Sequence, residues 1–229
     1  MTDQLSEFDQ LSNSFKLNIG GNIKSGKAWK TSFSYNNIQL NNKSYLDYAG
    51  VNSSMTFRSG SIKRTFGYLH QQKRYAKKNN ASSNTSINQI GFTQSFQSSP
   101  YYIVGRVAYR EKEVRLDKST SLSRFTFDTR IQRKIKNGAA SSLWKYAIYS
   151  RISIAAYEYA ETDADLAILY GSEYDKARKE KRYNLTLGIN SKLNNVQIKG
   201  SALLQYRDSN LPIYNYSKNI LEVEFQYRF

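Results

Sequence analysis

The chain of 229 residues contains no cysteine, only two prolines and a single histidine. Without cysteine it can form neither a disulfide framework nor a thiolate metal site. No apolar run is long enough to form a transmembrane helix. The hydrophobic fraction of 39% is also low for a soluble core in a chain of this length. These absences argue against both a helical membrane protein and an ordinary soluble domain.

Aromatic residues and cations are abundant instead. The 19 tyrosines and 11 phenylalanines exclude a disordered chain, which would lack such residues. Lysine and arginine outnumber the acidic residues by 34 to 18, which gives a net charge of +16. This charge alone fits a nucleic-acid-binding protein, but the placement of the cations described below does not.

Apolar and polar residues alternate from about residue 13 to the end of the chain. In the last segment one face carries Leu221, Val223, Phe225, Tyr227 and Phe229, and the other carries Glu222, Glu224, Gln226 and Arg228. A period of two indicates a β-strand. The pattern recurs along the chain, more weakly at residues 50–58 and 86–97. We count roughly 11 strands, each about long enough to cross a bilayer at a tilt.

The connections between these strands alternate between short and long. Short turns are predicted at Ser25–Gly26, Arg58–Gly60, Ser98–Pro100, Lys136–Gly138 and Asn194–Asn195. Long connections are predicted at about 40–48, 75–85, 111–120, 158–181 and 208–219. Outer-membrane barrels have this asymmetry, whereas a soluble β-sandwich has no reason for it. We therefore predict an all-β fold, a transmembrane antiparallel up-and-down β-barrel with about 11–12 strands in this chain, integral to a Gram-negative outer membrane.

The last residues resemble a recognition signal for barrel assembly. A terminal Phe229 follows Phe225 and Tyr227 at alternating positions. Such a pattern is similar to the signal that the barrel assembly machinery recognises, and a chance aromatic strand is the alternative. We expect the outer-membrane lipid and lipopolysaccharide to surround the folded chain.

The number of strands raises a question of closure. A single-chain bacterial barrel usually has an even number of strands, with both ends in the periplasm. Here the strand at Phe15 and the last strand are expected to run in the same direction. Residues 1–12 are polar, lack a lipid-facing pattern and contain no secretion signal. We therefore expect residues 13–229 to be the C-terminal part of a longer protein, or another chain to supply missing strands.

The inward face of the predicted barrel is rich in cations. Its candidate lumen-lining residues are Lys16, Lys30, Lys63, Arg106, Arg110, Arg124, Arg130, Arg151, Lys199, Arg207 and Arg228, with the acids Asp128, Glu222 and Glu224. One interpretation is a lumen stabilised by charge pairing and water. The other is a pathway for an anionic or polar passenger. Nucleic acid is disfavoured because these cations would lie inside the barrel.

Catalysis and metal binding have little support in the sequence. The single histidine, His70, is expected near the outer end of its strand as an interfacial or loop residue, so we expect no enzyme and no cofactor. Glu161, Asp163 and Asp165 alternate in the longest loop, but a solvated acidic loop is favoured over a calcium site. The apolar stretch Leu166–Tyr170 in the same loop could fold over the barrel, contact a partner or continue a strand.

The segment before the last strand resembles a known family. The residues Asp208, Ser209, Asn210, Pro212, Tyr214 and Tyr216 lead into the strand that ends at Phe229. This is similar to the end of the surface lipoprotein assembly modifier (Slam) family, the translocators of type XI secretion. The resemblance is firm over about the last 50 residues and loose back to residue 100. The repeat domain that precedes the barrel in that family is absent from this sequence.

The resemblance implies a function that the residues alone do not establish. It implies a barrel of about 14 strands that exports lipid-anchored or soluble protein clients to the cell surface. It also implies that Pro212 fixes a turn and that Tyr214 and Tyr216 lie in the outer aromatic girdle. A general or anion-preferring porin, or a barrel that contacts a host through its loops, remains the alternative.

Overall fold

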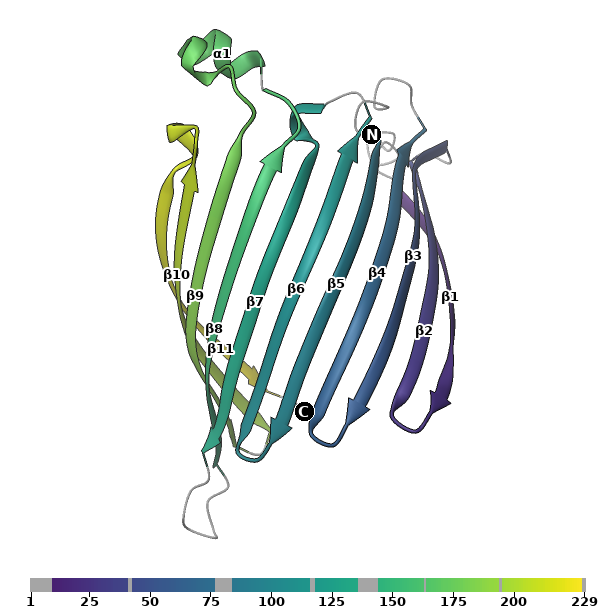
Figure 1. Cartoon of the computed structure of the whole chain (residues 1–229), viewed down its shortest axis with the longest axis vertical. Helices are drawn as coiled ribbons and strands as arrows, with labels where there is room; N and C mark the ends of the chain where they lie inside the picture. The colour runs from purple at the N-terminus through teal and green to yellow at the C-terminus, as the bar shows by residue number, and fades with distance from the viewer. Residues whose placement is uncertain are drawn as a thin grey trace, which may run out of the picture.

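The computed structural model of the chain describes residues 10–40, 43–76, 84–115, 118–135, 144–162, 164–193 and 195–227. These residues form one sheet of 11 strands, in which each strand pairs antiparallel with its neighbours in sequence. The tilted strands lie side by side in a curved wall (Figure 1). The predicted all-β fold of antiparallel up-and-down strands is therefore confirmed.

The strands are longer than a bilayer crossing requires. Their bounds are β1 Gln10–Lys24, β2 Lys27–Leu40, β3 Lys43–Ser59, β4 Ile62–Tyr75, β5 Thr85–Ser98, β6 Tyr101–Val114, β7 Leu122–Ile135, β8 Trp144–Tyr159, β9 Lys179–Leu193, β10 Val196–Ser209 and β11 Tyr216–Tyr227. A membrane-spanning strand needs about 9–11 residues. The additional residues extend the wall beyond the membrane. The first strand begins at Gln10, inside the segment that we expected to be separate.

The wall is a single layer without a core of its own. Among the described apolar side chains, only Val114, Ala147, Ala155 and Leu211 are buried. Large apolar side chains are exposed along every strand from β1 to β11 instead, as the 85% exposure of Leu221 illustrates. Hydrophobic burial inside the protein cannot stabilise such a sheet, so its apolar side chains need a hydrocarbon solvent.

The strand register divides the side chains into two faces. Phe66, Phe92 and Val107 are direct neighbours across three strands and share the apolar face. Arg106 and Asp128 are neighbours on the opposite, polar face. On β7 the polar-face side chains of Arg124, Asp128 and Arg130 are half-buried, whereas Phe125, Phe127 and Ile131 on the apolar face of the same strand are exposed. Because side chains converge on the inside of a curved sheet, this crowding identifies the polar face as the concave one.

Charges on the apolar face lie only at its two ends. Near the short turns they include Lys27, Arg64 and Arg133, and near the long connections they include Asp47, Arg74, Glu111, Glu158, Lys181 and Asp208. Between these two rims the described residues of the apolar face carry no charge. This charge-free band, which we call the apolar belt, is where the wall meets the hydrocarbon of the membrane.

Several predicted connections are shorter in the structure. The predicted loops at 40–48 and 111–120 were wrong in extent, because β2 reaches Leu40, β3 begins at Lys43 and β6 continues to Val114. Backbone pairing continues above the belt, where no lipid-facing pattern marks a strand. The turn at Ser25–Gly26 is confirmed. The turns predicted at Arg58–Gly60 and Ser98–Pro100 lie at Gly60–Ser61 and Ser99–Pro100, because β3 continues to Ser59 and β5 to Ser98. Gly26 adopts a φ of 75°, and a Cβ there would meet the carbonyl oxygen of Arg58 at 2.4 Å. The turn predicted at Lys136–Gly138 lies outside the described residues.

A short helix, α1 (Ala164–Tyr170), stands above the ends of β8 and β9 (Figure 1). It contains the apolar stretch Leu166–Tyr170, so the alternative that this stretch continues a strand was wrong. Ile168 is 81% exposed, which shows that the helix does not fold into the barrel. Among the described residues, no helix is long and apolar enough to cross a membrane.

Candidate functional site

The predicted cations gather on one face of the wall. Every described member of the set lies on the polar face, as the register of β1 to β11 shows. The acids Asp128, Glu222 and Glu224 lie on the same face. Arg228 and Phe229 lie outside the described residues. That this face lines a water-filled lumen stays a prediction.

The predicted cations of the polar face lie closest together on β6, β7 and β8. Arg110 is the direct cross-strand neighbour of Arg124, and Arg130 is that of Arg151. Asp128 is the only acid of these three strands on this face within the described residues. Its Oδ2 lies 2.7 Å from Nε of Arg151. One carboxylate therefore faces a group of arginines, which we call the arginine strip: Arg106, Arg110, Arg124, Arg130 and Arg151.

Neutral partners orient the strip. Nε of Arg110 donates to Oε1 of Gln89 at 2.7 Å. The Arg130 guanidinium lies 4.5 Å from the centre of the Tyr149 ring and donates to Gln132 at 3.1 Å. Amide oxygens and aromatic faces hold a guanidinium without neutralising its charge. The strip therefore keeps a positive potential on the concave face.

The remaining predicted cations are more dispersed. Nζ of Lys199 pairs with Oε2 of Glu224 at 2.9 Å across β10 and β11. Lys16 and Lys30 line a polar hollow of about 290 Å³ on β1 to β4. Lys63 lies at the turn end of β4. The structure therefore brings together the arginines of β6–β8 but leaves the lysines separate from them.

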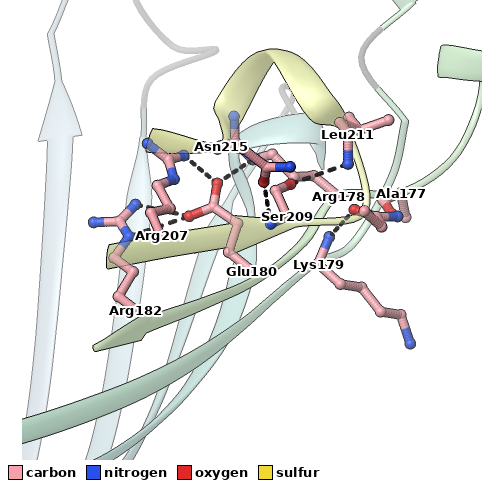
Figure 2. A network of polar contacts seen from close by, with 10 residues as sticks. Ala177, Arg178, Lys179, Glu180, Arg182, Arg207, Ser209, Leu211 and Asn215 are labelled. Atoms are coloured by element: carbon pink, nitrogen blue, oxygen red, sulfur yellow. Dashed lines mark hydrogen bonds and ion pairs between the residues drawn. The ribbon is translucent and has the colours of Figure 1, made fainter. Parts of the chain in front are cut away.

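A second charged cluster, absent from the predicted set except for Arg207, lies at the loop end of β9 and β10 (Figure 2). Glu180 is only 2% exposed. Its carboxylate pairs with Arg178 at 2.8 Å and Arg182 at 2.9 Å, and also with Arg207. We call these four residues the Glu180 cluster. The alternation Arg178-x-Glu180-x-Arg182 was the sequence signal, because it places three charges on one face of a strand.

Tyrosines enclose this cluster. The guanidinium of Arg178 lies 3.7 Å from the ring centre of Tyr159 and 4.2 Å from that of Tyr214. Arg182 lies 4.3 Å from the ring of Tyr157. The arginines thus contact aromatic faces from β8 and from the β10–β11 connection. These cation–π contacts join the ends of four consecutive strands.

The residues of the family-like segment support the same cluster. Asn210 accepts from the backbone N–H of Lys179 at 2.7 Å and donates to the carbonyl oxygen of Ala177 at 3.0 Å. Asn215 accepts from the N–H of Ser209 at 2.6 Å, and Ser209 Oγ accepts from the N–H of Leu211 at 3.1 Å (Figure 2). These bonds fix the backbone on both sides of the connection.

The expected places of the aromatic residues in this segment need correction. Pro212 begins a 3-10 turn, η5 (Pro212–Tyr214), as expected of a turn-fixing residue. Tyr214 stacks on Arg178, and Tyr216 is the cross-strand neighbour of Arg207 on the polar face. Their assignment to the lipid-facing girdle was therefore wrong. The attraction of the tyrosine rings to the guanidinium cations turns them inward.

The Glu180 cluster lies outside the apolar belt. Lys181 and Asp208 are cross-strand neighbours on the apolar face at this level, which marks the upper rim. Burial works to raise the pKa of the Glu180 carboxyl, but hydrogen bonds from Arg207 and Arg182 outweigh it. The pKa of Glu180 is therefore held below its ordinary value, and the carboxylate stays charged.

The other candidate residues lie apart from these clusters. His70 is on the apolar face, where its Nδ1 lies 2.7 Å from Oδ1 of Asn88. No group of metal-ligating side chains occurs in the described part of the chain, and Asp163 lies outside it. Phe225 and Tyr227 point outward from β11, 72% and 58% exposed. Their recognition by the assembly machinery stays a prediction.

No protein-family model and no curated protein sequence matches this chain. Solved structures do match its fold. The siderophore receptor PirA from Pseudomonas aeruginosa aligns with a TM-score of 0.62 at 6% identity, over 99% of this chain and 40% of the receptor. PirA from Acinetobacter baumannii gives a TM-score of 0.63 at 8% identity, over 95% and 38%. The outer membrane transporter YddB from Escherichia coli gives 0.51 at 14%, over 95% and 36%.

The chain thus spans less than half the length of these proteins. At such low identity the likeness concerns the fold alone. Together with the apolar belt, it confirms an outer-membrane β-barrel fold and the integral outer-membrane location that this fold implies.

Proposed function

We propose that this chain forms part of the wall of an outer-membrane transport barrel whose polar face guides a polar or anionic passenger. The observation that carries the proposal is the arginine strip, which faces a single acid, Asp128, among the described residues of β6 to β8. Cations aligned on a concave surface attract anionic groups and raise their local concentration. A lumen stabilised by internal charge pairing alone would need more acids on this face.

The passenger in this proposal is a protein that is moved to the cell surface, as in type XI secretion. Support comes from the segment Asp208–Tyr216, which resembles the surface lipoprotein assembly modifier family. Its polar side chains hold the loop end of β9 to β11 in one conformation. A passenger leaving the barrel would pass this fixed rim. The siderophore receptors and the outer membrane transporter named above share the fold, which is consistent with transport as the general class.

An anion-preferring porin is the second candidate. It is favoured by the same arginines, because a row of cations around a water-filled pore selects small anions without any protein client. The two candidates differ in what passes through the barrel, a protein client or small anions.

The first test compares two arginines of one strand. Arg130→Gln removes a charge from the polar face, whereas the control Arg133→Gln removes one from the turn-end rim of the apolar face. We expect Arg130→Gln to reduce anion preference in planar-bilayer conductance, and the control to leave it unchanged. Equal effects of the two variants would contradict a role for the polar face in transport.

The second test separates the two candidates. Surface-exposed lipoproteins are compared by protease shaving and mass spectrometry in cells with and without the full-length protein. Loss of a defined lipoprotein from the surface supports the translocator. Unchanged surface lipoproteins together with anion conductance would leave the porin.

A further inference from the structure

A furrow crosses the apolar face from β2 to β7. Two rows of side chains form its banks, and each row follows direct cross-strand neighbours. The lower row includes Trp29, Met55 and Phe66. The upper row includes Tyr68, Ile90 and Tyr109. The furrow is open to the outside and has a volume of about 660 Å³, and Gly67 and Gly91 contribute to its floor.

Small side chains widen the furrow at its β2–β3 end. Thr31 and Ser53 are cross-strand neighbours in the upper row, where other strands carry Tyr68, Ile90 or Tyr109. Their hydroxyl oxygens lie 3.0 Å apart, and one hydroxyl donates a hydrogen bond to the other. They therefore present a short, internally bonded surface to whatever fills the furrow, and the bond lowers the cost of placing two hydroxyls in the belt.

The furrow runs obliquely through the apolar belt. It crosses five strand spacings, which gives a length of roughly 24 Å at ~4.8 Å per strand. At its β2 end Thr31 lies four residues from Lys27 of the lower rim. Near its other end, on β6, Tyr109 lies two residues from Glu111 of the upper rim, and its hydroxyl donates to that carboxylate at 2.9 Å. The furrow thus climbs from the middle of the belt to the loop-end rim.

We propose that this furrow binds one acyl chain of a membrane lipid, which enters at the loop-end rim beside Tyr109 and extends down to Thr31 and Ser53. The occupant must be a hydrocarbon, because the furrow lies wholly within the charge-free belt. Its length exceeds the ~15 Å that one leaflet contributes to a hydrocarbon core of ~30 Å, so a whole acyl chain fits along it. The polar Tyr109–Glu111 pair lies where the headgroup of that lipid belongs.

Photo-labelling tests the proposal independently of any passenger. The full-length protein is placed in vesicles of phosphatidylethanolamine and phosphatidylglycerol that contain a trace of phospholipid with a photoreactive diazirine in its acyl chain. We expect labelling of peptides from β2 to β6 to exceed several-fold that of outward-facing peptides from β8 to β10, whose own apolar hollow is smaller, about 420 Å³. Even labelling around the wall would overturn the proposal and leave only bulk lipid contact.

Two variants sharpen the test. Ser53→Phe fills the furrow with an apolar side chain that the belt tolerates, and we expect it to reduce labelling of β2–β6 to the level of β8–β10. Ile131→Phe adds bulk to the apolar face outside the furrow and should leave the distribution unchanged. If Ser53→Phe inserts but keeps the preference for β2–β6, the furrow is not the site. If it fails to insert, the distribution in the unmodified protein still decides.

Discussion

The apolar face and the polar face of the sheet place their side chains in opposite ways. On the apolar face each side chain meets the same solvent, hydrocarbon, and few of them form specific contacts. On the polar face position depends on a partner: Arg151 on Asp128, Arg130 on Tyr149, and Arg207 on Glu180. A substitution on the apolar face should therefore change stability according to its depth in the membrane and the polarity of the new side chain. A substitution on the polar face should change stability through the partner side chain that it leaves unpaired.

Both faces end at the two edge strands, β1 and β11. We expect the largest effect on stability there, from backbone groups left without a hydrogen-bond partner. Among the described residues β1 pairs only with β2, and β11 only with β10. Each unpaired backbone group in hydrocarbon costs several kcal/mol. Because β1 and β11 run in the same direction, antiparallel closure needs an odd number of further strands between them. We expect cysteine pairs placed on β1 and β11 to give no direct cross-link in membranes. An efficient cross-link would show that the two edges close in parallel.

Removing a shared partner on the polar face should give the next largest effect. Glu180→Ala leaves Arg178, Arg182 and Arg207 together without their carboxylate. We expect a loss of roughly 3–5 kcal/mol in unfolding free energy, the cost of breaking a buried ion pair. Glu224→Ala, which disrupts the half-exposed pair with Lys199, serves as the control and should cost about 0–1 kcal/mol. Urea unfolding in micelles measures both, and equal losses would remove the special role of Glu180.

A charge within the apolar belt should cost somewhat less. Ile152 points outward from the middle of β8, and Ile152→Arg places a cation in the hydrocarbon. We expect a destabilisation of about 2–4 kcal/mol, as for lipid-facing arginine at the bilayer midplane. Arg151→Ile makes the opposite exchange, an apolar side chain in place of a cation, at the neighbouring position on the polar face. The loss of heat-modifiable mobility in outer-membrane fractions measures insertion, and normal insertion of Ile152→Arg would contradict the belt.

Acidification should weaken the Glu180 cluster by a smaller amount. The folded-state pKa of Glu180 lies below its ordinary value of 4.5. Its contribution to stability is therefore complete above pH 4.5 and is lost as the pH falls through the lower, folded-state value. Unfolding at several pH values should show this loss in the unmodified protein and not in Glu180→Gln. The same acid sensitivity in both proteins would assign it to other carboxylates.

The sequence was sufficient to predict the strands of the wall and their two faces, but not the side-chain contacts on the polar face. Alternation from Leu221 to Tyr227 predicted both the last strand and its two faces, because a lipid-facing strand must repeat with a period of two. The limits of β2 and β3 could not be predicted, since backbone pairing continues beyond the belt without a side-chain pattern. The Glu180 cluster and the tyrosines around it are far apart in the sequence: Arg178 lies 19 positions after Tyr159 and 36 positions before Tyr214, and only the register brings the three together.

The central claim is that the two faces meet different solvents, and an accessibility scan along β7 tests it most directly. The chain contains no cysteine, so single cysteines can be introduced from Arg124 to Ile131 and spin-labelled. Collision with lipid-soluble oxygen should be highest at positions 125, 127, 129 and 131, and collision with a water-soluble nickel complex at the even positions. Nickel accessibility that is equal on both faces, or highest at the odd positions, would contradict the account.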